Sequence, residues 1–263
     1  DGSPKLLSHI WTLEGLEGVK AFERKYNSNN HEEDQPPKIC LGGGAYTGNE
    51  TGNRTGGKKN EKFLITGGAG FIGTNLAHRL LSMGKNVMLF DNLSRPGVEK
   101  NVQWLESMHG ESVNVRIADI RDRYILEEAV RGVKGIFHFA AQVAVTSALA
   151  DPVADFEVNA RGTLNLLEAV RSLEKPPPLL FTSTNKVYGE MKDVRLKETD
   201  TRYQPQEASM DLYGFDETRP LDFYSPYGCS KGAADQYVID YARTFGLPAV
   251  VFRMSCIYGP HQF

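Results

Sequence analysis

The chain has 263 residues, 40% of them hydrophobic and 24% charged, the composition of a globular protein with one large domain, or one domain and a tail. Its net charge of −3 gives no basic surface for nucleic acid or an anionic membrane, and no apolar run approaches the roughly 18 residues of a membrane helix. Cys40, Cys229 and Cys256 lie far apart and form no metal-ligand spacing, so we expect reduced thiols, no metal and a cytoplasmic location.

Residues 1–61 are predicted to be an N-terminal extension that does not belong to the fold that follows. The pattern from Leu6 to Phe22 predicts one amphipathic helix. Residues 42–59 are dominated by Gly, Asn, Thr and Lys, too poor in apolar side chains to form a core, which indicates a flexible linker.

Strand patterns and helix patterns alternate from Lys62 onward. The predicted strands are 62–66, 86–90, 113–117, 135–140, 178–183 and 248–253. The predicted helices are 73–82, 98–108, 123–131, 154–172 and 227–245. The alternation predicts an α/β fold over residues 62–263: a doubly wound parallel sheet of Rossmann type, with helices on both faces.

A glycine-rich turn follows the first predicted strand and opens the first predicted helix. Gly67 permits a tight turn, Gly70 lets the backbone approach a phosphate, and Gly73 lets the helix pack closely on the strand. The N-terminus of the predicted helix, directly after Phe71 and Ile72, presents free N–H groups to an anion. The spacing is Gly-x-x-Gly-x-x-Gly rather than Gly-x-Gly-x-x-Gly, so a bare structural turn is the alternative. In this strand–turn–helix context we expect a dinucleotide pyrophosphate.

Polar residues follow the second and third predicted strands, where a doubly wound sheet binds its ligands. Asp91 is placed to accept hydrogen bonds from ribose hydroxyls and to repel a 2′-phosphate, which favours NAD over NADP. Arg95 weakens that preference, and a turn role for Asp91 beside Asn92 is the alternative. Asp119 and Ile120 lie where an adenine ring would bind.

The fourth predicted strand ends in small residues. Ala140, Ala141 and Gln142 would let the ribose and phosphates of a cofactor approach the backbone. His138, within the same strand, is more readily explained as a packed core histidine than as a catalyst.

Tyr227 and Lys231 lie four residues apart, on one face of a predicted helix. An ammonium beside a phenol lowers the pKa of the phenol, which makes Tyr227 a usable general base near neutral pH. Ser183 and Thr184 end the fifth predicted strand, where they could share a hydrogen bond with a reacting hydroxyl. Their alternative role is simply to cap the strand end.

Together these features resemble the extended short-chain dehydrogenase/reductases, the NAD-dependent epimerases and dehydratases of nucleotide sugars. The resemblance covers residues 62–263. It is closest to a family member that acts at C2 of a CDP-linked deoxyhexose. The stretches similar to that member are 90–95, 162–171, 183–189 and 221–237, together with the polar insert 190–226. It implies bound NAD and a nucleotide-sugar substrate; we also expect a homo-oligomer and no nucleic-acid or membrane partner.

The resemblance implies roles for single residues. The implied catalytic residues are Thr184, Tyr227 and Lys231, with Thr184 as the hydroxyl partner of the tyrosine. The implied NAD contacts are Gly67, Gly70, Phe71, Ile72, Gly73, Asp91, Asn92, Asp119, Ile120, Ala140, Ala141, Gln142, Asn159, Tyr227 and Lys231. The implied substrate contacts are Gln142, Thr184, Asn185 and Ser255, and the run from Arg253 to Ser255 corresponds to residues beside the nicotinamide and the sugar.

The implied reaction is a hidden redox cycle. Tyr227 takes the proton of the sugar C2 hydroxyl while NAD accepts hydride from C2. The 2-keto sugar then turns over and takes the hydride back on its opposite face, so NAD must remain bound throughout.

Three alternatives stay open. The first is a UDP-sugar 4-epimerase. Family members that act on UDP-galactose have an asparagine near the position of Cys256, so the resemblance disfavours this activity. A 4,6-dehydratase is disfavoured by Asn185 and Lys186, where dehydratases carry an Asp-Glu pair. Family members continue past the sixth strand into the lobe that grips the nucleotide sugar. We therefore expect a chain truncated at its C-terminus, and a non-catalytic NAD-binding module is the third alternative.

Overall fold

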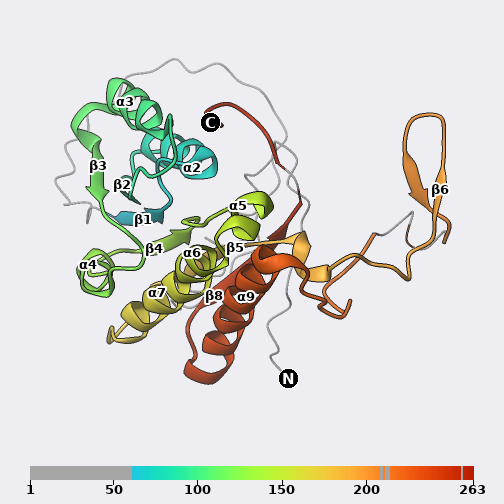
Figure 1. Cartoon of the computed structure of the whole chain (residues 1–263). Helices are drawn as coiled ribbons and strands as arrows, with labels where there is room; N and C mark the ends of the chain where they lie inside the picture. The colour runs from blue at the N-terminus through green and yellow to red at the C-terminus, as the bar shows by residue number, and fades with distance from the viewer. Residues whose placement is uncertain (1–60, 208–209, 211–213, 256) are drawn as a thin grey trace, which may run out of the picture. The chain divides into compact units, whose positions relative to one another are not determined.

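The structure of the protein, a computed structural model, describes residues 61–207, 210, 214–255 and 257–263 (Figure 1). The predicted N-terminal helix and linker lie outside the described residues, as do Cys40 and Cys256.

Six parallel strands form the central sheet. They are β1 (Lys62–Thr66), β2 (Asn86–Asp91), β3 (Val113–Ile117), β4 (Gly135–His138), β5 (Leu179–Thr184) and β8 (Ala249–Met254). Their order is β3-β2-β1-β4-β5-β8, so the direction of winding reverses between β1 and β4. Thr66 of β1 pairs with Phe90 of β2 and with His138 of β4, which brings the carboxyl ends of these strands to one edge. The predicted doubly wound sheet is confirmed.

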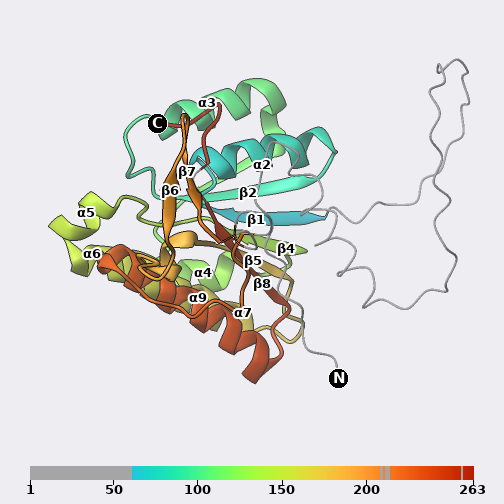
Figure 2. The ribbon, with the colours of Figure 1, turned by 90° about the vertical axis from the view of Figure 1, so that its right-hand side faces the viewer.

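Helices cover both faces of the sheet. They are α2 (Phe71–Ser82), α3 (Val98–His109), α4 (Arg123–Ala129), α7 (Gly162–Arg171) and α9 (Ser225–Phe245), with a 3-10 turn over Gly110–Ser112. Figures 1 and 2 show α2 and α3 on one face and α4, α7 and α9 on the other. Local sequence sets the helix ends: Asp122 accepts hydrogen bonds from the first turn of α4, Pro226 lies in the first turn of α9, and Gly246 ends α9 in the left-handed region.

A large apolar cluster lies between the sheet and the layer of α4, α7 and α9. Leu64, Ile136 and Phe181 of the sheet pack in this cluster with Leu166 and Leu167 of α7, and all five side chains are fully buried. Burial of each such side chain contributes roughly 2 to 3 kcal/mol. This core holds the strand ends, and therefore the site described below, in fixed positions.

The predicted helix 154–172 is divided into three parts. α6 (Pro152–Phe156) begins after the capping residue Asp151, and a π-helical turn over Glu157–Arg161 leads into α7. Hydrophobic spacing over so short a stretch does not distinguish a π-helical turn from the α-helix on either side, so the prediction of one continuous helix was wrong.

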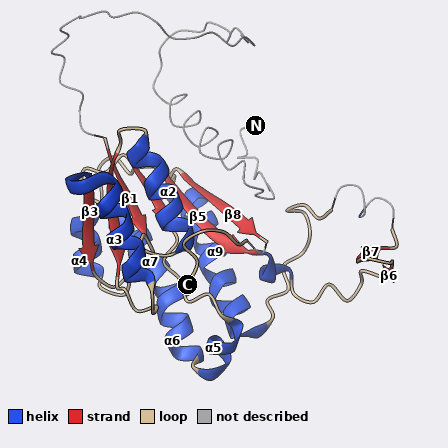
Figure 3. Ribbon diagram, turned by 90° about the horizontal axis from the view of Figure 1, so that it is seen from above, coloured by secondary structure: helices blue, strands red, loops and turns tan. Residues whose placement is uncertain are grey.

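Several short elements were not predicted. They are α5 (Val145–Ala150), a 3-10 turn over Asn185–Tyr188, and the two-stranded antiparallel sheet of β6 (Leu196–Glu198) and β7 (Tyr203–Pro205). α5 and α6 lie beside α9, as Figure 3 shows, so they form the surroundings of the catalytic helix proposed from the sequence.

Candidate functional site

Most of the residues predicted to bind a cofactor or substrate lie at or just past the carboxyl ends of the parallel strands. They are Gly67, Gly70, Phe71, Ile72 and Gly73 after β1; Asp91 and Asn92 at the end of β2; Asp119 and Ile120 after β3; Ala140, Ala141 and Gln142 after β4; Thr184 and Asn185 at the end of β5; and Ser255 after β8. Tyr227 and Lys231 come to the site from α9, and Asn159 from the π-helical turn.

The glycine turn is packed so tightly that side chains would disrupt it. Gly67 has φ +68°, and a Cβ there would lie 2.6 Å from the nitrogen of Ala140. A Cβ on Gly73 would lie 2.3 Å from the oxygen of Gly67. By contrast, a Cβ on Gly70 would meet only the oxygen of Gly67, at 3.2 Å, so the space beside Gly70 is open.

The first turn of α2 begins directly after Gly70. Gly70 is the N-cap residue and provides no side-chain hydrogen bond to the helix start. Asn101, which is buried in α3, steadies the turn by donating from Nδ2 to the oxygen of Ala69 at 2.8 Å. A close backbone turn at a helix N-terminus, where the first N–H groups have no partner within the helix, suits a pyrophosphate, so these residues fit a dinucleotide.

Asp91 faces this turn from the end of β2. Its carboxylate accepts hydrogen bonds from the backbone nitrogen of Ala69, at 3.0 Å, and from that of Leu93, at 2.9 Å. Burial raises the pKa of Asp91, and the two backbone hydrogen bonds and the charge of Arg95 oppose that rise. The carboxylate is thus a turn residue, as the alternative stated, and its contact with a ribose remains a prediction.

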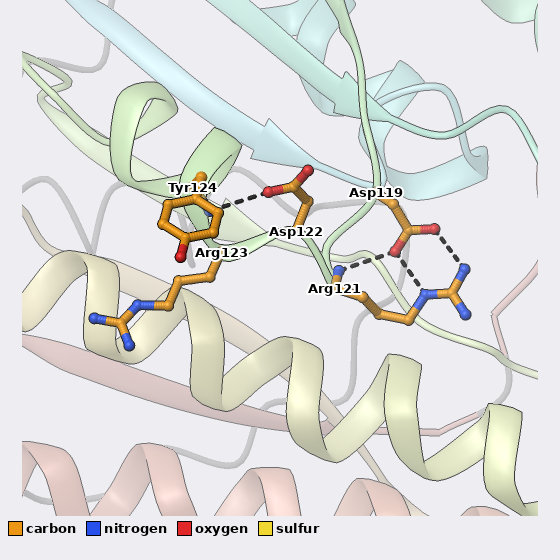
Figure 4. Close-up of a pocket in the computed structure, with 5 residues that line it drawn as sticks. All are labelled: Asp119, Arg121, Asp122, Arg123 and Tyr124. Carbon is orange, nitrogen blue, oxygen red and sulfur yellow. Dashed lines mark hydrogen bonds and ion pairs between the residues drawn. The ribbon is translucent and has the colours of Figure 1, made fainter.

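Asp119 lines a shallow hollow after β3 (Figure 4). Its carboxylate accepts two hydrogen bonds from the guanidinium of Arg121, both at 2.8 Å, and one from Nδ2 of Asn92 at 2.8 Å. Its pKa is lowered, chiefly by the hydrogen bond from Arg121. Next to it, Ile120 is buried against Gly162 of α7. The hollow is lined by Asp119, Arg121, Asp122, Arg123 and Tyr124, so it offers carboxylates and an aromatic ring, whereas Ile120 is not part of its lining.

His138 is a packed core residue, as predicted. It is fully buried, and its ring nitrogens contact the hydroxyls of Thr66, at 2.7 Å, and Thr163, at 2.9 Å. Thr163 donates its own proton to the oxygen of Asn159, so the ring must donate from Nε2 and accept at Nδ1, which fits the neutral imidazole. Burial, and then the charge of Lys231, lowers the pKa of His138 to about 3.

Lys231 lies one helical turn after Tyr227 and is almost completely buried. Its Nζ donates to the backbone oxygen of Thr182 at 2.7 Å and lies 4.3 Å from the ring centre of Phe181. Burial lowers its pKa to about 7, while the charges of Asp235 and Asp155 oppose that fall. Burial thus favours the neutral amine at this position, and the two carboxylates favour the ammonium.

The hydroxyl residues at the end of β5 differ from each other. Thr184 accepts a hydrogen bond from the backbone nitrogen of Lys186 at 3.2 Å, so it caps the 3-10 turn that follows, as its alternative role stated. Ser183 Oγ is buried and has no hydrogen-bond partner in the described part of the chain. Asn185 is half-buried beside Thr184, whereas Ser255 is exposed.

Asn159 and Gln142 are held by other protein groups. Oδ1 of Asn159 accepts a hydrogen bond from the backbone nitrogen of Gln142 at 2.9 Å, and Nδ2 of Asn159 donates to the backbone oxygen of Gln142 at 3.1 Å. The Gln142 amide in turn bonds both backbone groups of Ala144. These residues therefore shape the loop after β4, and direct contact with a cofactor or substrate remains a prediction.

Arg253 does not extend freely toward a ligand. Its guanidinium makes two hydrogen bonds to the buried carboxylate of Asp235, both at 2.9 Å, and one to the hydroxyl of Tyr188, at 2.9 Å. Arg253 thereby joins β8 to α9. It belongs to the run predicted to lie beside the nicotinamide and the sugar, but its guanidinium is bound by protein groups instead.

Three residues of the site were missed at the level of the sequence. They are Asn101, Asp155 and Ser230, all of them buried. Asp155 and Asn159 are four residues apart, a spacing that places both on one helix face, and Ser230 directly precedes Lys231. That spacing was the only available signal, because the hydrogen bonds that join these residues connect separate elements.

No helix among the described residues is long and apolar enough to cross a membrane. Within the same part of the chain, no group of three or more His, Cys, Asp or Glu side chains is placed to hold a metal ion.

Comparison with known proteins gives consistent results. Residues 63–263 match the model of the NAD dependent epimerase/dehydratase family. The chain is 47% identical over 209 residues to a CDP-paratose 2-epimerase from Salmonella typhi, an alignment that covers 77% of this chain and 59% of that protein. A putative UDP-glucose 4-epimerase from Methanocaldococcus jannaschii is 33% identical over 200 residues, covering 76% and 57%.

A solved structure shows the same architecture. The UDP-glucose 4-epimerase of Thermus thermophilus, in complex with NAD, aligns with a TM-score of 0.60 and 34% identity, covering 77% of this chain and 57% of that one. The chain thus spans less than three fifths of the length of each of these relatives.

Proposed function

The chain belongs to the NAD dependent epimerase/dehydratase family, and from that premise we propose that it is the cofactor-binding part of an NAD-dependent sugar-nucleotide 2-epimerase acting on CDP-paratose. The observation that carries the proposal is the 47% identity to a CDP-paratose 2-epimerase, compared with 33% to the putative UDP-glucose 4-epimerase. The product would be CDP-tyvelose.

The residues at the strand ends fit NAD. The glycine turn and the start of α2 would hold the pyrophosphate, Asp91 would accept from the adenosine ribose, and the hollow beside Asp119 would receive the adenine. When bound, NAD supplies the site with a hydride acceptor that can return the hydride to the same substrate.

The chain's own residues would move and hold the proton. Tyr227 would take the proton of the C2 hydroxyl as hydride leaves C2, and would return it after the 2-keto sugar has turned over. Lys231, as an ammonium, would stabilise the phenolate, and its place at the end of β5 suits the nicotinamide ribose. Thr184 would share a hydrogen bond with the reacting hydroxyl.

The two other activities in the family are the second candidates. A 4,6-dehydratase is the weaker one: dehydratases resemble one another in the Asp-Glu pair that follows the Thr184 position, where this chain has Asn185 and Lys186. A UDP-sugar 4-epimerase would act at a different carbon of a different substrate, and Cys256, where members that act on UDP-galactose carry an asparagine, disfavours it.

We extend the proposal to organisation and assembly. Residues 1–61 would form an extension and 62–263 the NAD-binding domain. Exposed apolar side chains on adjacent helices offer a surface for a homo-oligomer: Leu149 of α5, Val153 and Phe156 of α6, and Tyr237 of α9. The cytoplasmic location stays a prediction.

A product assay tests the proposal. The purified chain, loaded with NAD, is incubated separately with CDP-paratose, UDP-glucose and dTDP-glucose, and the sugar nucleotides are separated by chromatography. Conversion of CDP-paratose to CDP-tyvelose, with the other two unchanged, is the expected result. Conversion of UDP-glucose or dTDP-glucose instead would support a second candidate, and an NAD-loaded chain that converts none would be a non-catalytic module.

A further inference from the structure

A buried polar cluster joins α6 and the π-helical turn to α9. Its members are Asp155, Asn159 and Ser230, none of them more than 3% exposed. Nδ2 of Asn159 donates to Asp155, at 3.1 Å, and to Ser230, at 3.0 Å. Ser230 Oγ donates to the other carboxylate oxygen of Asp155. α6 and α9 are neighbours in the layer below the sheet, so the cluster locks the two together (Figures 1 and 3).

The Asp155 carboxylate lacks a directly paired cation. Its hydrogen bonds come from an amide and a hydroxyl, which are neutral, and no Lys, Arg or His of the described chain forms an ion pair with it. Burying a carboxylate costs several kcal/mol unless charge or hydrogen bonds compensate. Burial raises the pKa of Asp155, and the hydrogen bond from Ser230 and the charge of Lys231, the next residue, oppose that rise.

Lys231 is a buried cation that requires negative charge nearby to stay protonated. Burial favours its neutral amine, and two carboxylates favour the ammonium: Asp235 on α9 and Asp155 on α6. Asp235 is already neutralised by its two hydrogen bonds to the guanidinium of Arg253. Two further titratable groups face Lys231: His138 on β4, which burial holds neutral, and Tyr227, one helical turn before it on α9. Of these two carboxylates, Asp155 is therefore the one that no cation of the described residues pairs with, and its hydrogen bond to Ser230 joins it to the residue directly before Lys231.

We propose that Asp155 is a positioning residue of the catalytic helix: through Ser230 it fixes the turn that carries Tyr227 and Lys231, and its charge keeps Lys231 an ammonium. The inference rests on the proposed roles of Tyr227 and Lys231. Its physical content, the charge state of Lys231, can nevertheless be measured without substrate or cofactor.

The experiment follows Lys231 by NMR in the full chain, with lysines labelled at Cε and Nζ, between pH 5 and 11. A Lys231→Arg variant assigns the signal. Asp155→Asn replaces the carboxylate with an amide of nearly equal size, and Asp155→Ser is a second neutral variant should the first fold poorly. Asp151→Asn is the matched control, because Asp151 is an exposed carboxylate at the start of the same helix.

We expect Asp155→Asn to lower the pH midpoint of the Lys231 titration by about one unit, because a single nearby charge shifts a buried pKa by that order. Asp151→Asn should leave the midpoint unchanged. A folded Asp155→Asn or Asp155→Ser protein with an unchanged midpoint would overturn the inference, as would an equal shift in Asp151→Asn. In an active preparation, the alkaline limb of the kcat profile should move to lower pH with the same variant. A shift in the NMR midpoint without any epimerase activity would leave this inference standing and count against the proposed function alone.

Discussion

Tyr227 is the residue on which the proposed chemistry depends most. Replacing it by Phe removes the proton-carrying hydroxyl and leaves the glycine turn and Asp91 intact. We therefore predict that Tyr227→Phe keeps NAD and loses turnover by at least about 100-fold, the usual contribution of a general base. Product formation and the NAD content of the purified protein measure the two effects. Tyr237→Phe, on the exposed side of the same helix, is the control and should retain turnover. Undiminished turnover in Tyr227→Phe would remove this residue from the mechanism.

His138 makes the fold sensitive to acid. Its pKa is about 3 in the folded protein because of burial and the charge of Lys231, whereas the unfolded chain titrates near 6.5. Below pH 6.5 the unfolded chain therefore binds a proton that the folded chain does not, and stability falls as the pH drops toward 3. The loss amounts to at most about 1.4 kcal/mol per pH unit.

Urea unfolding at pH 7, 6 and 5 measures this effect. A His138→Gln variant can still bond the hydroxyls of Thr66 and Thr163 but does not titrate. We predict that its free energy of unfolding falls less steeply with decreasing pH than that of the unaltered protein. Parallel pH curves for the two proteins would show that His138 is not the source of the acid sensitivity.

Among the elements, the glycine turn is the one proposed to hold the NAD pyrophosphate, and its close packing makes substitutions there informative. A Cβ on Gly73 would lie 2.3 Å from the backbone oxygen of Gly67, so α2 must move away from the turn if Ala is introduced there. We predict that Gly73→Ala lowers stability by roughly 1 to 3 kcal/mol, the usual cost of overpacking, and weakens NAD binding. Thermal unfolding and calorimetric titration with NAD would show both changes. Gly84→Ala is the control: it lies in open space with φ +72°, so it should cost stability without changing NAD affinity.

The elements also show which parts of the secondary structure could be predicted from the sequence. The predicted strands 62–66 and 113–117 have the bounds that the structure gives, because each is a short patterned run between turn residues. The helix 154–172 was predicted as one piece because its apolar spacing continues through the π-helical turn. The hairpin of β6 and β7 was missed because its three-residue strands are too short for a recognisable alternation.

The site divides in the same way. Residues at strand ends could be predicted, since parallel strands bring their carboxyl ends to one edge. Hydrogen bonds between distant segments could not: Asn101 reaches the glycine turn from α3, and Asp155 reaches Ser230 across 75 positions. The pKa of Lys231 was unforeseen for the same reason, because burial follows from the packing of α9 on β5 and not from the Tyr-x-x-x-Lys spacing.

At the scale of the whole molecule, the six strand ends and α9 bring together the residues that we propose to form a dinucleotide site, all of them between 62 and 255. The chain nevertheless spans less than three fifths of the length of the relatives compared above. The central claim is therefore that this part of the fold can both remove hydride from C2 and return it.

The fate of a deuterium label at C2 of CDP-paratose tests that claim most directly. The NAD-loaded chain is incubated with the C2-deuterated substrate in ordinary water, and the product is examined by mass spectrometry and NMR. If hydride leaves C2 and returns from the same bound cofactor, CDP-tyvelose should form with deuterium retained at C2. Loss of the deuterium to solvent, or no conversion by protein that holds NAD, would contradict the account.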